Sequence, residues 1–211
     1  TERNTAFAMA SVAGTLAKMA FDACMFNSQN FGFVRLPKEC TTGSSIMPHK
    51  KNPDVFELLR AKCNKLQPLP QQVTLIMNNL PSGYFRDLQI IKEEFLPAFG
   101  ELKDCLRMAA YIVSKMEVNR HILDDPRYDL MFSVEEVNRL AADGMPFRDA
   151  YKKVGLDIEA GRFTPCKDIS HTHEGSIGNL CNDKISTLMD NIIAGFTFDR
   201  VEKAEKKLLC E

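Results

Sequence analysis

The sequence predicts an all-α protein, a bundle of long helices followed by a smaller helical part. Apolar residues recur at steps of three and four along most of the 211 residues, and period-2 alternation is convincing nowhere. Recognisable helix start and stop signals bound the periodic stretches. The balance of 27 basic and 28 acidic side chains argues against a nucleic-acid or anionic-membrane partner.

The first helix is expected over residues 6–28. Its apolar seam is predicted to consist of Phe7, Ala10, Gly14, Ala17, Phe21 and Cys24. The many alanines would allow a neighbouring helix to approach closely. Residues 31–52 lose this period and are expected to form a long loop.

A second helix is expected to begin at "NPD", residues 52–54, because proline suits a first helical position. Pro68 and Pro70 should break or kink this helix. A further helical stretch, 71–80, ends at the turn "LPSGY".

Residues 86–116 hold the longest helical pattern. Its predicted stripe is Leu88, Ile91, Phe95, Phe99, Leu102, Leu106, Ala109 and Val113. Pro97 should kink this helix rather than end it, because the stripe keeps its phase on both sides.

The elements become shorter after about residue 118. Ser133 and Glu136 fit a capping box, and Gly144 should end the helix that they begin. Pro146 should open the next helix and Gly155 should close it.

Residues 157–181 are loop-rich, and helices near 182–194 and 199–209 finish the chain. The predicted organisation is a bundle part, 1–117, carrying the loop 41–54, and a small helical part, 118–211.

The seven cysteines are odd in number and lack C-x-x-C spacing, which indicates reduced thiols, most of them buried, in a cytoplasmic protein. No run of about 18 apolar residues is present, so no membrane span is expected. No secretory leader is visible at "TERNT". The start without methionine suggests a processed or truncated product.

His171 and His173 lie between Cys166 and Cys181 in a loop-like stretch. The spacing does not match common zinc arrangements, so we expect a solvated loop and no metal. No cofactor is predicted either.

The stretch "TTGSSIMPHKKNPD", residues 41–54, collects polar groups in a segment that is too broken to be regular. Ser44 and Ser45 offer hydroxyls, Lys50 supplies a cation, and Asn52 adds neutral donors. Such a loop ahead of a rigid helix suits a lid that closes on an anionic substrate. The alternative is an N-capping loop with solvated lysines.

Within this stretch, "GSSIMPHKKNP" resembles the signature of the fumarase/aspartase superfamily, G-S-S-x-M-P-x-K-x-N-P, at all eight fixed positions. The resemblance implies a long-helix fold and an elimination β to a carboxylate that yields fumarate. It implies that Ser44 is the catalytic base and that Lys50 and Asn52 hold the substrate carboxylate.

Residues 80–93, "LPSGYFRDLQIIKE", resemble the Y-x-R-D-L-Q-x-x-K pattern of the argininosuccinate lyase family. The resemblance implies that Tyr84, Gln89 and Lys92 hold the arginine-like half of argininosuccinate, which is cleaved to arginine and fumarate in the last step of arginine biosynthesis. Three alternatives stay open: adenylosuccinate lyase, which shares "MPHK" with His49; a non-catalytic structural relative; and an interaction module with exposed apolar helices.

The likeness covers residues 1–156 and fades beyond them. It implies a homotetramer in which each active site takes residues from three subunits. The family's N-terminal domain and its histidine-bearing segment have no counterpart here. We therefore expect the C-terminal portion of a longer enzyme, without lyase activity on its own.

Overall fold

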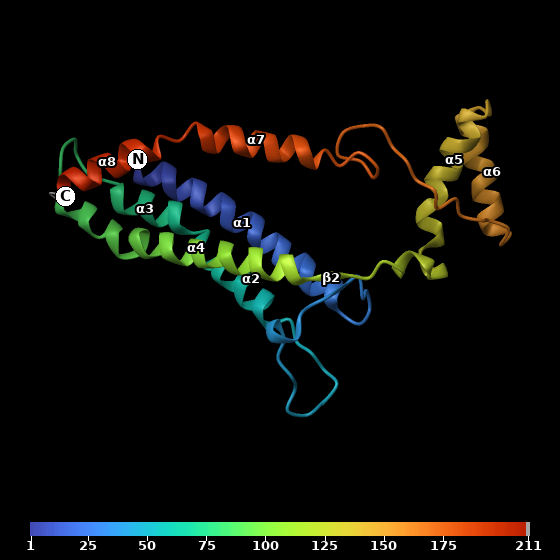
Figure 1. The fold of residues 1–211 in the computed structure, drawn as a ribbon, viewed down its shortest axis with the longest axis horizontal. Helices are drawn as coiled ribbons and strands as arrows, with labels where there is room; N and C mark the ends of the chain where they lie inside the picture. The colour runs from blue at the N-terminus through green and yellow to red at the C-terminus, as the bar shows by residue number, and fades with distance from the viewer. Residues whose placement is uncertain (210–211) are drawn as a thin grey trace. The chain divides into compact units, whose positions relative to one another are not determined.

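A computed structural model describes residues 1–209 and divides into two units, Thr1–Asp124 and the part from Asp125 onward, which are described separately. The first unit is built on helices (Figure 1). Its α-helices are α1 (Glu2–Asn27), α2 (Asp54–Leu66), α3 (Leu69–Met77) and α4 (Ile91–Lys115). Its shorter elements are β1 (Val34–Arg35), η1 (Lys38–Cys40), η2 (Arg86–Gln89), β2 (Glu117–Val118) and η3 (Ile122–Asp124).

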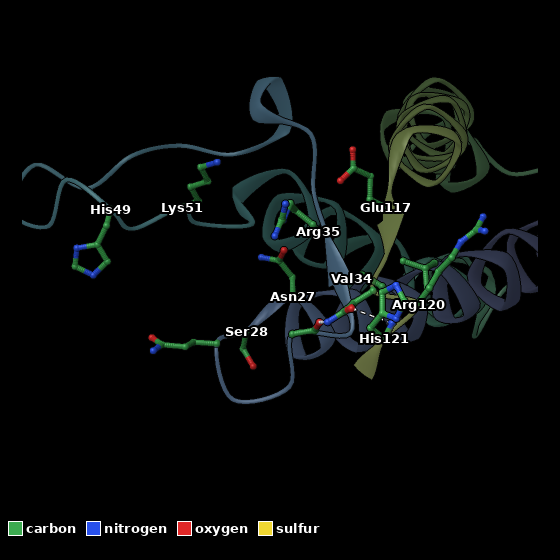
Figure 2. Close-up of a pocket in the computed structure, with 13 residues that line it drawn as sticks. Asn27, Ser28, Val34, Arg35, His49, Lys51, Glu117, Arg120 and His121 are labelled. Carbon is green, nitrogen blue, oxygen red and sulfur yellow. Dashed lines mark hydrogen bonds between the residues drawn. The ribbon is translucent and has the colours of Figure 1, made fainter. Parts of the chain in front are cut away.

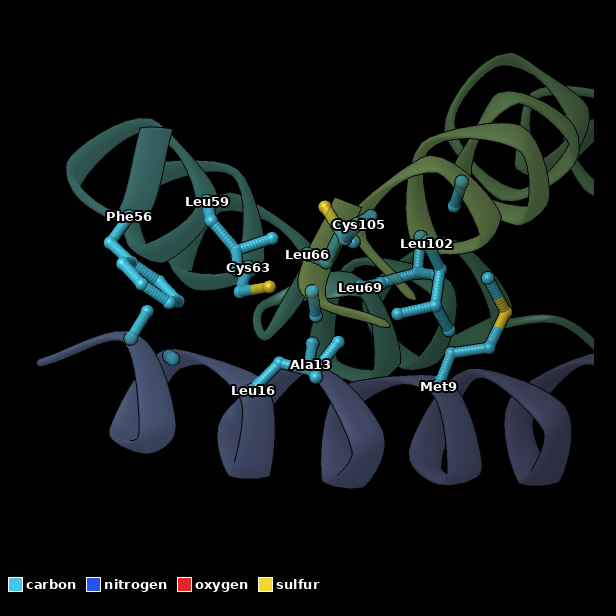
Figure 3. Close-up of a cluster of buried hydrophobic side chains, with 14 of the residues drawn as sticks. Met9, Ala13, Leu16, Phe56, Leu59, Cys63, Leu66, Leu69, Leu102 and Cys105 are labelled. Atoms are coloured by element: carbon cyan, nitrogen blue, oxygen red, sulfur yellow. The ribbon is translucent and has the colours of Figure 1, made fainter. Parts of the chain in front are cut away.

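The core of the first unit lies where α1 packs against α2, α3 and α4. Figure 3 shows side chains of α2 and α4 facing Met9, Ala13 and Leu16 of α1. Phe56 of α2 and Ile112 of α4 are completely buried. Burying one such side chain contributes about 1.5–3 kcal/mol, so these contacts hold the long helices side by side.

The predicted seam of α1 is confirmed at Ala17 and wrong at Phe7 and Phe21. Phe7 is 58% exposed and Phe21 is 52% exposed. The buried stripe consists of Ala6, Met9, Ala13, Leu16, Ala17, Ala20 and Ala23. Both stripes are apolar, so periodicity alone could not choose between them; the alanine stripe is buried because it lets α2 approach closely.

The long helix α4 is confirmed, and Pro97 lies inside it without ending it. Its predicted stripe is confirmed at Ile91, Leu102 and Ala109. The stripe is wrong at Phe99, Leu106 and Val113, which are exposed. The core instead takes Ala98, Cys105 and Ile112, which recur every seven residues and so keep one face toward α1 and α2.

The break between α2 and α3 at Pro68 is confirmed. Helix α2 begins at Asp54, one residue later than predicted, and Pro53 takes the N-cap position. Asn52 precedes the cap and pairs with Thr42 in an isolated bridge.

Two very short strands were not predicted. Val34 pairs with Val118 and Arg35 pairs with Glu117 in an antiparallel ribbon that joins the segment after α1 to the segment after α4. Two residues are too few to show an alternating pattern. The predicted domain border at 117/118 falls within β2 and stays a prediction.

The second unit begins with η4 (Pro126–Phe132) and continues through α5 (Ser133–Ala142), α6 (Phe147–Glu159), α7 (Asn182–Ala194) and α8 (Phe198–Leu208). Its small core joins α5 to α6 through Val137, Ala150 and Val154. The two final helices are confirmed close to their predicted bounds. In the described part of the chain, no helix combines the length and apolarity that crossing a membrane requires.

Two cap predictions in this unit are wrong. Ser133 is the first residue of α5 and caps nothing, because η4 already enters the helix in a helical conformation. Glu136 instead accepts hydrogen bonds from Arg139 at 2.7 and 2.9 Å. Gly155 lies inside α6, and Gly161, at φ +67°, follows the end of that helix instead.

Candidate active site

The loop between η1 and α2 is closed at its base by backbone pairing. The Thr42 amide donates to the Asn52 carbonyl at 3.2 Å, and the Asn52 amide donates to the Thr42 carbonyl at 2.9 Å. The Thr42 hydroxyl also donates to the Asp54 carboxylate at the start of α2. Residues 43–51 therefore project from a base that is fixed to the bundle (Figure 1).

Ser44 lies just past this base and is half-buried. Its Oγ accepts hydrogen bonds from the backbone amides of Ile46 at 3.2 Å and Met47 at 3.1 Å. Two N–H groups aimed at one oxygen stabilise negative charge on it more than they stabilise the neutral hydroxyl. The loop therefore favours the alkoxide that a basic serine requires.

The other two predicted loop residues, Lys50 and Asn52, belong to residues 49–52, which lead into α2 and are called here the second arm of the loop. The side-chain amide nitrogen of Asn52 lies 3.5 Å from the backbone carbonyl oxygen of Gly43, the residue before Ser44. Lys50 is exposed and forms no ion pair within residues 1–209, so its ammonium is available to an anionic ligand. The loop thus brings Asn52 close to Ser44 and leaves Lys50 in solvent.

The predicted trio is joined by hydrogen bonds. The Gln89 side-chain amide donates to the Tyr84 hydroxyl, and the Lys92 ammonium donates to the Gln89 carbonyl oxygen at 2.6 Å. All three side chains are exposed, Tyr84 at 67%. Together they present a hydroxyl, an amide and a cation at the start of α4, a set that suits the carboxylate and amine of an amino acid.

The trio and the loop lie at opposite ends of the helices of the first unit. The trio precedes and opens α4, whereas the loop lies near β2, which follows α4 (Figure 1). The 25 residues of α4 span roughly 37 Å at 1.5 Å per residue. One copy of the chain therefore cannot bring both groups to one small substrate.

A pocket of about 560 Å³ lies beside the loop, bounded by the end of α1, the β1–β2 ribbon and the second arm of the loop (Figure 2). His49 and Lys51 line it, whereas Ser44, Lys50 and Asn52 do not. Sequence reasoning missed Arg35 and Arg120, which also line it. The ribbon brings these residues together, and two-residue strands leave no signal in the sequence.

The histidines of the second unit have a carboxylate partner. His171 Nε2 lies 3.2 Å from Glu135 Oε1 of α5, and the rings of His171 and His173 lie 5.5 Å apart. This contact joins the segment that carries His171 to α5.

The six described cysteines are free; Cys40, Cys63 and Cys105 are buried and the others are half-buried. Burial raises the pKa of the Cys63 thiol to about 12. Cys210 lies outside the described residues.

Comparison with known proteins gives concordant findings. Residues 3–67 match a family model described as "Lyase". Over 208 residues, 99% of the chain, it is 76% identical to an argininosuccinate lyase of Phocaeicola vulgatus, 74% to one of Bacteroides thetaiotaomicron and 71% to one of Parabacteroides distasonis. The chain spans about half, 47%, of the length of each of these relatives.

Solved structures share the fold at low sequence identity. A 3-carboxy-cis,cis-muconate lactonizing enzyme from Pseudomonas putida matches 76% of the chain with a TM-score of 0.62 at 22% identity, over 36% of its own length. A "fumarate lyase:delta crystallin" from Brucella melitensis matches 76% with a TM-score of 0.59 at 23% identity, over 35% of its own length.

The helical bundle therefore has the fold of these solved enzymes, and its first part, which contains the signature loop, matches the family described as "Lyase". Within that class the chain belongs to the argininosuccinate lyase family, of whose curated members it spans about half the length.

Proposed function

We propose that this chain is the part of an argininosuccinate lyase that supplies the catalytic loop and the site for the arginine-like half of the substrate. The whole enzyme would cleave argininosuccinate to arginine and fumarate, the last step of arginine biosynthesis. The observation that carries the proposal is the 71–76% identity to argininosuccinate lyases over 99% of the chain. The hydrogen-bonded trio and the two amides at Ser44 support it.

In this proposal Ser44, as an alkoxide, removes a proton from the carbon β to the departing nitrogen. The electron pair moves into the adjacent carboxylate, which then carries additional negative charge. Lys50 and Asn52 bind this more highly charged form more strongly than they bind the carboxylate of the unreacted substrate. The C–N bond then breaks, giving fumarate, and the leaving nitrogen takes a proton from an acid outside this chain. Tyr84, Gln89 and Lys92 hold the arginine end throughout.

The energetic difficulty lies in ionising a serine. Each unit by which the hydroxyl pKa is lowered needs about 1.4 kcal/mol of preferential stabilisation of the alkoxide. The amides of Ile46 and Met47 supply part of this. Closure of the loop over the substrate, which excludes water and brings Lys50 nearer, would supply more.

The separation of loop and trio supports a site shared between copies. We propose a homotetramer in which the loop of one copy meets the trio of another. We also propose a cytoplasmic location, since six free cysteines suit a reducing compartment.

The test uses the full-length enzyme and follows fumarate formation by its ultraviolet absorbance. We expect Ser44→Ala to lower kcat by about three orders of magnitude, because it removes the base. Ser45→Ala, the matched control on the neighbouring exposed hydroxyl, should keep most of the activity. Equal activity of the two variants would refute the assignment of Ser44. The 211-residue chain alone should show no turnover.

A further inference from the structure

The pocket in Figure 2 has an excess of positive charge that the proposed reaction does not use. Arg35 of β1, Arg120 after β2 and Lys51 of the loop line it, and Glu117 is the one acid among the described residues that line it. None of these three cations forms an ion pair within residues 1–209. The pocket therefore carries a net charge of about +2 with its histidines neutral.

Unpaired cations gathered around a cavity repel one another, and an anion between them relieves that repulsion. Arg35 offers a planar fork that matches the oxygens of a phosphate or carboxylate, and Lys51 adds a compact point charge. Figure 2 shows Asn27 and Arg35 on the bundle side of the pocket and Lys51 on the loop. All three line the pocket, so donors from the bundle and from the loop border one cavity.

The end of α1 also borders the pocket, and a helix C-terminus disfavours anions when its carbonyls are free. Here two of those carbonyls, Met25 and Phe26, and that of the cap residue Ser28 already accept hydrogen bonds. The Ser28 amide donates to Met25 at 3.0 Å, the Gly32 amide to Ser28 at 2.8 Å and the Phe33 amide to Phe26 at 2.9 Å. Their effect on a ligand is correspondingly reduced.

We propose that this pocket binds a small dianion with oxygen ligands, of the phosphate or dicarboxylate type, between Arg35 and Lys51. The bound dianion ties the second arm of the loop to the β1–β2 ribbon. The two adjacent lysines thus have different proposed ligands. Lys51 lines this pocket and would bind the dianion, whereas Lys50 does not line it and would bind the substrate carboxylate. Binding at this site does not depend on the lyase activity.

Limited proteolysis of the 211-residue chain tests the proposal, because trypsin cuts after Lys51 in the exposed loop. Cleavage is followed by mass spectrometry with inorganic phosphate, with fumarate, and with chloride at matched ionic strength. At ten times its Kd, a ligand that shields Lys51 should slow cleavage there about tenfold. Cleavage at Lys206 and Lys207 of α8 reports any effect on trypsin itself.

Arg35→Gln should abolish the protection, whereas Arg148→Gln, which removes an exposed cation of α6, should leave it intact. Whichever of phosphate and fumarate protects identifies the ligand type. Absence of protection by both, or protection that survives Arg35→Gln, would overturn the proposal. Circular dichroism checks the folding of Arg35→Gln. Should that variant not fold, Lys51→Gln takes its place, with cleavage after Lys50 as the readout and the same criteria.

Discussion

At the scale of single residues, the proposed chemistry depends most on Ser44. Its Oγ accepts two backbone amides from the next turn of the chain, at 3.1 and 3.2 Å. These bonds leave the hydroxyl proton free to depart. The sequence motif predicts the identity of this residue through resemblance, but the two amides become visible only in the structure.

Cys63 gives a pH-dependent prediction. Burial raises its pKa to about 12 from the ordinary value of 9.0. Above pH 9 the unfolded chain loses this proton while the folded chain keeps it, so the free energy of unfolding should fall between pH 9 and 12. Urea titrations at pH 8 and 10 measure the fall.

Cys63→Ala, compared over the same pH range, is the control for that prediction. It should be less stable at pH 8 because it leaves a small cavity, and its stability should fall less steeply with pH. If the free energy of unfolding fell equally steeply with pH in the variant and in the parent chain, Cys63 would not be the group responsible.

At the scale of elements, α2 separates a buried face from an exposed one. Phe56 is 0% exposed, whereas Leu58 of the same helix is 63% exposed. Phe56→Ala should lower the free energy of unfolding by about 3–5 kcal/mol, because it removes a core ring. Leu58→Ala should change it by less than about 0.5 kcal/mol. Urea denaturation of both variants measures this contrast. Similar losses of unfolding free energy in the two variants would show that α2 does not bury the face that carries Phe56 and expose the face that carries Leu58.

Helix α6 offers a matched pair of glycines. Gly155 lies inside the helix with open space around its Cα, so Gly155→Ala should stabilise the second unit by about 0.5–1 kcal/mol. Gly161 has φ +67°, where an added Cβ is strained, so Gly161→Ala should destabilise it by about 1–2 kcal/mol. Thermal melts of the two variants should shift in opposite directions; shifts of the same sign would contradict the helix bounds.

The same glycines show how far the sequence predicts elements. Most helices were predicted because the apolar spacing is strong and Pro68 and Gly144 break it. The end of α6 was misplaced, since a glycine inside a helix and one after its end look alike in a sequence. The capping box at Ser133 failed for a related reason: the motif describes a chain entering from an extended conformation, and η4 enters already helical.

At the scale of the whole molecule, α1 carries apolar residues on a face that the rest of the first unit leaves uncovered. Phe7 and Phe21 are exposed, and the alanine stripe beside them takes the core. A sequence with two apolar stripes cannot reveal which stripe faces its own chain. An apolar helix face of this kind suits burial against another copy, as the proposed tetramer requires.

The proposed sharing of the site between copies leads to the last prediction, which concerns two variants of the full-length enzyme that we expect to be inactive. Ser44→Ala damages the loop and Lys92→Gln damages the trio, and roughly 37 Å of α4 separate these groups within one copy. If each site takes its loop and its trio from different copies, mixed oligomers contain some sites in which both parts are intact. Random assembly of equal amounts should restore about a quarter of the parental activity.

The two variants are unfolded together, refolded, and assayed for fumarate formation. Ser44→Ala mixed with Asn52→Ala is the matched control: both changes lie on the loop, so no mixed site can hold an intact loop and activity should stay near zero. Recovery in the first mixture alone would mean that the loop and the trio act across a subunit boundary. Failure of both mixtures, with mass spectrometry confirming mixed oligomers, would show that one copy supplies both groups. The separation along α4 would then have to close by a large rearrangement of the bundle, which its close-packed alanine core opposes.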